Sequence, residues 1–84
     1  MNSIVLYSTP DCPRCKRLAV WLAEQGLEFA IMDLTIPAVL ADLRINGCFD
    51  REAPVLQIGD KYHSTRWLYE GDVLQTGKLM EVLR

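Results

Sequence analysis

The sequence predicts an α/β fold in which a mixed four-stranded sheet follows the order β-α-β-α-β-β-α. Near the start, two apolar segments flank an amphipathic segment, and together they span about thirty residues, the size of a βαβ unit with a right-handed crossover. Further along, only Gly59-Asp60 separates two short strand-like segments, which is typical of an antiparallel hairpin. A chain of 84 residues buries one modest core, so we expect residues 1–84 to form a single domain.

The first half of the chain predicts a strand, a helix and a second strand. Residues 3–8 form an apolar run rich in β-branched residues, as in a strand covered on both faces. A helix follows, because Pro13 suits the first helical position and Gly26 suits a C-cap. Its apolar positions fall at helical spacing: Cys15, Leu18, Ala19 and Leu22. Residues 28–34 predict the second strand.

The middle of the chain predicts a second helix and a third strand. The helix begins near Thr35 or Ile36, has Pro37 in its first turn and ends at Asn46-Gly47. Residues 54–58 read Pro-Val-Leu-Gln-Ile, which favours a strand.

The last part predicts a fourth strand and a final helix. Alternation starts at Lys61 and extends as far as Tyr69, and a short helix follows Gly77. Trp67 and Tyr69 then form either a docking patch for a partner or a cover for the hairpin. We expect the only histidine, His63, to be exposed on an edge strand and to have no role.

Composition argues against nucleic-acid and membrane partners. The formal charge is -2 and the pI about 5.2, whereas nucleic-acid-binding domains usually carry a basic surplus. The apolar run at residues 4–7 is too short for a signal peptide or a membrane span. We therefore expect a cytoplasmic protein, and a monomer. Thiols are kept reduced in the cytosol, and three cysteines are an odd number, so a structural disulfide framework is not expected.

Cys12 and Cys15 lie three positions apart at the predicted start of the first helix. At an N-cap, free N–H groups and the positive end of the helix dipole favour a thiolate and lower the pKa of Cys12. Asp11 opposes this effect with one exposed carboxylate. Three cations follow and reinforce it: Arg14, Lys16 and Arg17. Cys12 is therefore the predicted nucleophile.

Cys15 lies one turn further on, on the buried stripe, where it can reach Cys12 but not solvent. This predicts attack by Cys12 on a substrate disulfide and release by Cys15, with Pro13 stiffening the loop between them. The alternative is a zinc site, whose ligands would be Cys12, Cys15, Cys48 and His63. Zinc sites more often use two close pairs, so redox chemistry is favoured. For Cys48 itself, a buried inert thiol is favoured over a regulatory one.

Residues 5–15, Val-Leu-Tyr-Ser-Thr-Pro-Asp-Cys-Pro-Arg-Cys, are similar to the active-site stretch of glutaredoxins, with its Cys-Pro-x-Cys motif. Ala53-Pro54-Val55 falls where these proteins carry a proline with a cis peptide bond beside the cysteines. With its size and element order, the chain resembles the glutaredoxin and thioredoxin superfamily over nearly its whole length. The resemblance implies a thioredoxin-like fold.

The resemblance also implies substrate contacts and partners. Substrate would meet Pro13 and Arg14, the backbone of Ala53 and the groove shaped by Pro54. The implied activity is reduction of protein disulfides, including that of ribonucleotide reductase. Reductants would be a flavin-dependent reductase of the thioredoxin type or glutathione, with no tightly bound cofactor. A second alternative is an iron–sulfur cluster held through Cys12 at a dimer interface.

The departures from the family pattern concern glutathione. Glutaredoxins often carry Lys where Thr9 stands and Tyr where Arg14 stands. They also carry Gly-Gly followed by Asp, where this chain reads Ser64-Thr65-Arg66-Trp67. Arg51 could meet a glutathione carboxylate, although an exposed loop arginine is more often simply solvated. An incomplete glutathione site favours the flavin-dependent reductase.

Overall fold

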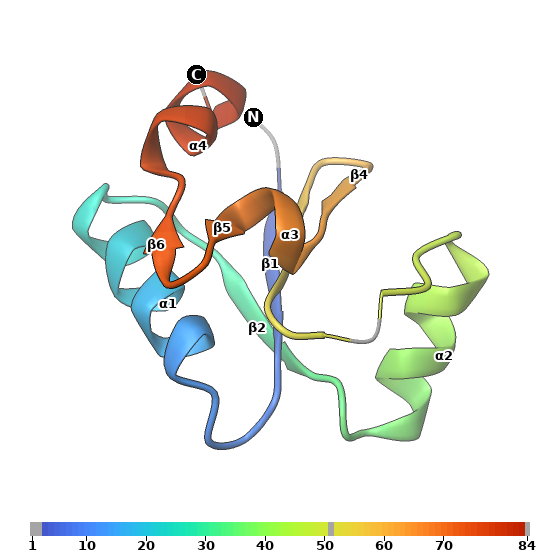
Figure 1. The fold of residues 1–84 in the computed structure, drawn as a ribbon. Helices are drawn as coiled ribbons and strands as arrows, with labels where there is room; N and C mark the ends of the chain where they lie inside the picture. Colours follow the sequence, from blue (N-terminus) through green and yellow to red (C-terminus); the bar gives the residue numbers. More distant parts are fainter. Residues whose placement is uncertain (1–2, 51, 84) are drawn as a thin grey trace.

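The computed structural model describes residues 3–50 and 52–83, which form a sheet with helices on both faces (Figure 1). The elements follow in this order: β1 (Ile4–Ser8), α1 (Pro13–Glu24), β2 (Ala30–Asp33), α2 (Pro37–Ile45), β3 (Val55–Ile58), β4 (Lys61–His63), α3 (Thr65–Leu68), β5 (Tyr69–Glu70), β6 (Val73–Leu74) and α4 (Thr76–Leu83).

The main sheet has the strand order β2-β1-β3-β4. β1 pairs in parallel with β2, with Leu6 opposite Ile31, and antiparallel with β3, with Leu6 opposite Leu56. β3 and β4 form the predicted hairpin across Gly59-Asp60. This mixed four-stranded sheet confirms the predicted thioredoxin-like α/β fold.

Each face of the sheet has its own core, because side chains alternate along the strands. On one face, Leu6 and Leu56 pack with Leu18 and Leu22 of α1 and with Leu79 of α4. On the other face, a smaller cluster joins α2 to the sheet; its buried members are Leu43, Cys48 and Val55. Figure 1 shows α1 and α4 on one side of the strands and α2 on the other.

The two helices that connect strands of the main sheet, α1 and α2, end in the same way. After α2, the amide of Gly47 donates to Arg44 O at 3.0 Å, and the amide of Cys48 donates to Leu43 O at 3.0 Å. Gly47 has φ +87°, the left-handed conformation that this Schellman ending requires. The ending directs Cys48 back against Leu43, which is why this cysteine is buried. Gly26 ends α1 in the same way.

The fourth strand is shorter than the sequence predicted. β4 ends at His63, and α3 begins at Thr65, so the prediction that alternation continues to Tyr69 was wrong. Thr65, Leu68 and Tyr69 are buried, and their i, i+3, i+4 spacing fits a helical turn rather than a strand. The chain then forms a small second sheet, the β5–β6 hairpin.

The aromatic side chains near β4 also differ from expectation. His63 is half-buried rather than exposed, and its ring stacks against Trp67 with 4.2 Å between centroids. Burial, followed by the charge of Lys61, lowers its pKa. Trp67 packs against the larger core and Tyr69 is 5% exposed, so these two rings cover the core.

The final helix, α4, includes Gly77 in its first turn instead of following it. Within residues 3–50 and 52–83, none of the helices has the length and apolar character needed to cross a membrane.

Candidate active site

Cys12 is the N-cap of α1, as predicted, and is joined to Cys15 in a disulfide. Its backbone is extended, with φ -107° and ψ 101°, and Pro13 occupies the first helical turn. The amide of Cys15 donates a hydrogen bond to Cys12 Sγ at 3.1 Å. An N–H group directed at the sulfur from a helix N-terminus is the arrangement that stabilises a thiolate there.

The two sulfur-bearing residues differ in exposure. Cys15 is 4% exposed and continues the buried stripe of Leu18 and Leu22, whereas Cys12 is half-buried. Their Cα atoms are 5.2 Å apart. Only Cys12 therefore offers its sulfur to a macromolecular substrate, as the helical spacing predicted.

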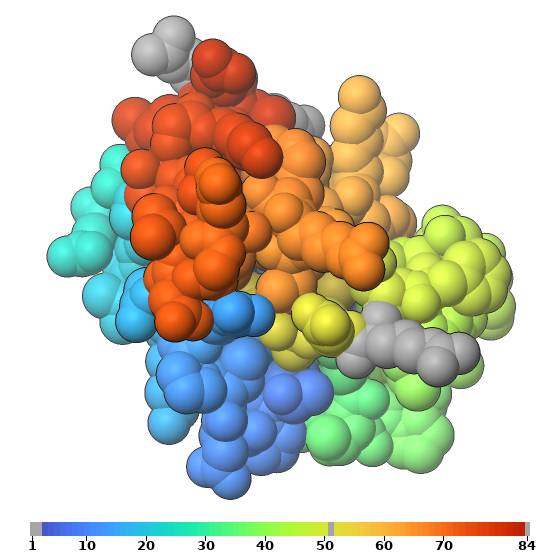
Figure 2. Space-filling model, viewed as in Figure 1, coloured from blue at the N-terminus to red at the C-terminus, as the bar shows by residue number. Residues whose placement is uncertain are grey.

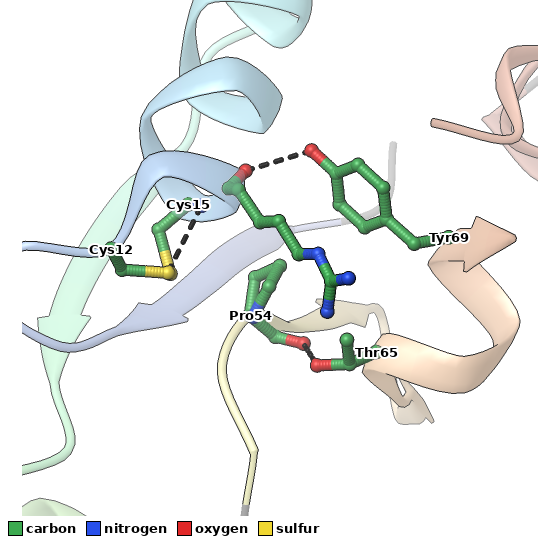
Figure 3. Close-up of a disulfide and its surroundings, with 6 residues drawn as sticks. Cys12, Cys15, Pro54, Thr65 and Tyr69 are labelled. Atoms are coloured by element: carbon green, nitrogen blue, oxygen red, sulfur yellow. Dashed lines mark hydrogen bonds between the residues drawn. A yellow bond between two sulfur atoms is a disulfide. The ribbon is translucent and has the colours of Figure 1, made fainter. Parts of the chain in front are cut away.

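Pro54 follows a cis peptide bond to Ala53, and its side chain is fully buried. Thr65, which is 4% exposed at the start of α3, donates from Oγ1 to Pro54 O at 2.7 Å (Figure 3). Sequence reasoning missed Thr65 because it assigned this residue to a continuous strand. A signal was present: Ser64 followed by apolar residues at helical spacing fits a helix start.

The β5–β6 hairpin contacts the middle of the dithiol motif. Arg14 Nη2 donates to Gly71 O at 2.9 Å and to Asp72 Oδ1 at 3.3 Å. In return, the Tyr69 hydroxyl donates to Arg14 O at 2.8 Å (Figure 3). Burial raises the pKa of Tyr69, although the charges of Arg17 and Arg14 oppose that shift. Figure 2 shows the blue surface at the start of α1 meeting the orange-red surface of this hairpin.

Beside the start of α3, a surface pocket of about 250 Å³ opens next to Thr65. The described residues that line it carry aromatic, acidic, hydroxyl and basic side chains: Phe49, Asp50, Glu52, Ser64, Thr65 and Arg66. Arg51, for which a solvated side chain was favoured over a contact with a glutathione carboxylate, lies outside the described residues.

Cys48 lies apart from the dithiol, in the small core beneath α2. It is 5% exposed, which confirms the prediction of a buried thiol. Its Sγ lies 3.4 Å from Asp50 Oδ2, and burial raises the pKa of this thiol. Within the described residues, no three His, Cys, Asp or Glu side chains gather as a metal-binding group. The zinc set predicted as an alternative is therefore not assembled.

A glutaredoxin family model matches residues 4–63, which is more than half of the chain. The chain belongs to the glutaredoxin family. The matched segment contains both cysteines of the motif and the Ala53–Pro54 peptide bond. Family membership and the close Cys12–Cys15 pair together support thiol–disulfide oxidoreductase chemistry. Among curated proteins, none matches the chain significantly.

Several solved structures are similar to this chain in fold. NrdH-redoxin from Escherichia coli, a glutaredoxin-like protein, is 27% identical, with 74% of this chain and 80% of that chain covered and a TM-score of 0.62. A glutaredoxin from Archaeoglobus fulgidus is 23% identical, with 100% of this chain and 88% of that chain covered and a TM-score of 0.72. Glutaredoxin 1 from Francisella tularensis is 16% identical, with 99% of this chain and 98% of that chain covered and a TM-score of 0.69. The last two show the fold alone.

Proposed function

We propose that this glutaredoxin-family protein reduces protein disulfides by a dithiol mechanism, with Cys12 as the nucleophile and Cys15 as the resolving thiol. The observation that carries the proposal is the asymmetry of the pair. Cys12 is accessible at a helix N-cap and accepts an amide hydrogen bond, whereas Cys15 is 4% exposed directly behind it.

The reaction runs in two balanced exchanges. The Cys12 thiolate attacks one sulfur of a substrate disulfide and expels the other as a thiolate, so a mixed disulfide forms. Cys15 then loses its proton and attacks Cys12 Sγ, which expels the second substrate thiolate. Two electrons pass to the substrate, and the Cys12–Cys15 disulfide remains. The burial of Cys15 limits its partner to Cys12.

The substrate would lie across the exposed edge of the motif. Pro13 is exposed beside Cys12, and Ala53 is half-buried before the fully buried Pro54. In this proposal, Pro13 and Arg14 form one side of the substrate groove, and Ala53 and Pro54 form the other. The bond from Thr65 to Pro54 O fixes the second side.

We further propose a protein reductase, rather than glutathione, as the usual electron source. Glutathione carries two carboxylates, and the described lining of the neighbouring pocket already holds the carboxylates of Asp50 and Glu52 against the single guanidinium of Arg66. The E. coli NrdH-redoxin, which is similar to this chain, has a thioredoxin-like activity profile. A flavin-dependent reductase would then recycle the protein in a reducing, cytoplasmic compartment. Ribonucleotide reductase is one candidate acceptor.

The test uses cysteine variants with a model protein disulfide. Cys12→Ser should abolish reduction, and Cys15→Ser should accumulate a mixed disulfide through Cys12, which mass spectrometry would locate. Cys48→Ala is the matched control, because it removes a thiol outside the motif, and it should retain reduction. Full activity in Cys12→Ser would overturn the proposal. Parallel assays with thioredoxin reductase and with glutathione would decide the reductant, and faster recycling by glutathione would contradict our choice.

A further inference from the structure

The contact between α1 and the β5–β6 hairpin involves a charge inside the dithiol motif. Arg14 lies between Cys12 and Cys15 in sequence, yet its guanidinium is bound by the hairpin turn, through Gly71 O and the carboxylate of Asp72. The guanidinium carbon also lies 5.5 Å from the centre of the Tyr69 ring. The hairpin therefore holds the charged end of Arg14, the cation that lies two positions after Cys12 in the sequence.

The turn is itself held in place. Arg17 Nη1 donates to Asp72 O at 2.6 Å, one turn along α1 from Arg14. Gly71 has φ +62°, which gives the two-residue turn a glycine at its first central position. Asp72 is therefore fixed through its main chain, while its side chain is 90% exposed and its carboxylate contacts Arg14. Such a carboxylate can be neutralised without disturbing the turn.

The ionisable groups near the dithiol motif come from two segments. The motif and the first turns of α1 carry Asp11, Arg14, Lys16 and Arg17, and the hairpin that contacts Arg14 and Arg17 carries the phenol of Tyr69 and the carboxylates of Glu70 and Asp72. Positive charge near a thiolate stabilises it, and a carboxylate that neutralises that charge removes part of the effect. Asp72 is the carboxylate that contacts Arg14 within the described residues.

We propose that Asp72 is a positioning residue for Arg14, which holds the guanidinium at the hairpin and compensates its charge, and so limits thiolate formation at Cys12 in the reduced protein. The hairpin thereby sets the reactivity of the nucleophile. This inference deepens the proposed function, since it concerns the same sulfur, but it predicts a proton equilibrium that exists without any substrate.

The test compares reduced variants by the pH dependence of Cys12 alkylation with iodoacetamide, with the modified residue identified by mass spectrometry. Asp72→Asn keeps a hydrogen-bond acceptor for Arg14 and removes only the charge. It should move the midpoint to lower pH, with roughly a twofold rise in the acid dissociation constant, as expected for a screened surface charge. Asp72→Glu should behave like the wild type. The Cys12–Cys15 potential should become less negative in Asp72→Asn, because the reduced form is stabilised.

Two controls separate positioning from a general charge effect. Glu70→Gln makes the same charge change on an exposed residue of the same hairpin and should shift the midpoint less. In an Arg14→Gln background, Asp72→Asn should lose most of its effect, because it acts through Arg14. No shift in Asp72→Asn, a shift equal to that of Glu70→Gln, or an undiminished shift without Arg14 would overturn the inference. Failure of Cys12 to reduce disulfides would overturn the proposed function alone, because alkylation needs no substrate.

Discussion

Removing the Tyr69 hydroxyl should weaken the fold by loosening the hairpin from the dithiol motif. In Tyr69→Phe the ring remains in the core, where Tyr69 is 5% exposed, and only the 2.8 Å bond to Arg14 O is lost. A hydrogen bond of this kind contributes about 0.5–1.5 kcal/mol net. For a domain of this size, a loss of about 1 kcal/mol lowers the Tm by roughly 4–8 °C.

The measurement is urea unfolding of the oxidised protein at neutral pH. With an m-value of about 2 kcal/mol/M, a loss of about 1 kcal/mol moves the midpoint by roughly 0.5 M while m stays unchanged. The control is Tyr62→Phe, the same chemical change at a half-buried tyrosine of β4; in the described part of the chain, the tyrosine hydroxyls that form hydrogen bonds are those of Tyr7 and Tyr69. That variant should unfold close to the wild type.

The pH dependence of this difference has a definite sign. Because burial raises the pKa of Tyr69 in the folded protein, its neutral form contributes stability below the unfolded tyrosine pKa of about 10. That contribution is lost as pH rises through the folded value, so the deficit of Tyr69→Phe should shrink in alkali. A Tyr69→Phe protein as stable as Tyr62→Phe at neutral pH would refute the reasoning.

Three other predictions concern the contact that holds Pro54 and the end of α2. Thr65→Val leaves Pro54 O without its donor and should cost about 1–3 kcal/mol in a thermal melt, and an unchanged melt would contradict the role given to this bond. Gly47→Ala should cost about 1 kcal/mol from its φ of +87° alone, because nothing lies within 4 Å of the added Cβ. Gly47→Asn should cost less, and the reverse order in urea unfolding would be inconsistent with the Schellman ending. Burial raises the pKa of Cys48 above the ordinary thiol value of about 8.5, so its alkylation in the native protein should be slower than that of an ordinary thiol. Its contribution to stability should fall as pH rises through the raised pKa. Rapid labelling at neutral pH would show that the thiol is open to solvent.

Much of the fold was predictable because local signals and the tertiary structure agree. Pro13 after Cys12 indicates a helix start, and the structure places the N-cap there. Gly26 and Gly47 indicate helix endings, and both have positive φ. The burial of Cys15 follows from helical spacing alone. These features depend on neighbours in the chain, which a sequence displays directly.

The segment after β4 was less predictable because two periodicities compete there. Residues 61–69 alternate as a strand would, yet Leu68 and Tyr69 pack inward from a helical turn. Gly71-Asp72 between Glu70 and Val73 is a two-residue hairpin signal that the longer alternation concealed. The contact between Arg14 and Asp72 spans 58 positions, and no local pattern indicates which acid an exposed arginine will meet.

The central claim is that Cys12 and Cys15 form a reversible two-electron couple. The most direct measurement equilibrates the protein in dithiol–disulfide buffers and counts free thiols at each cysteine by mass spectrometry. We expect one two-electron transition confined to Cys12 and Cys15, at a potential between roughly -120 and -270 mV, the range of related dithiols. Cys48 should remain a thiol throughout. A Cys12–Cys15 disulfide that stays closed, or thiols that stay reduced, across that whole range would contradict the account.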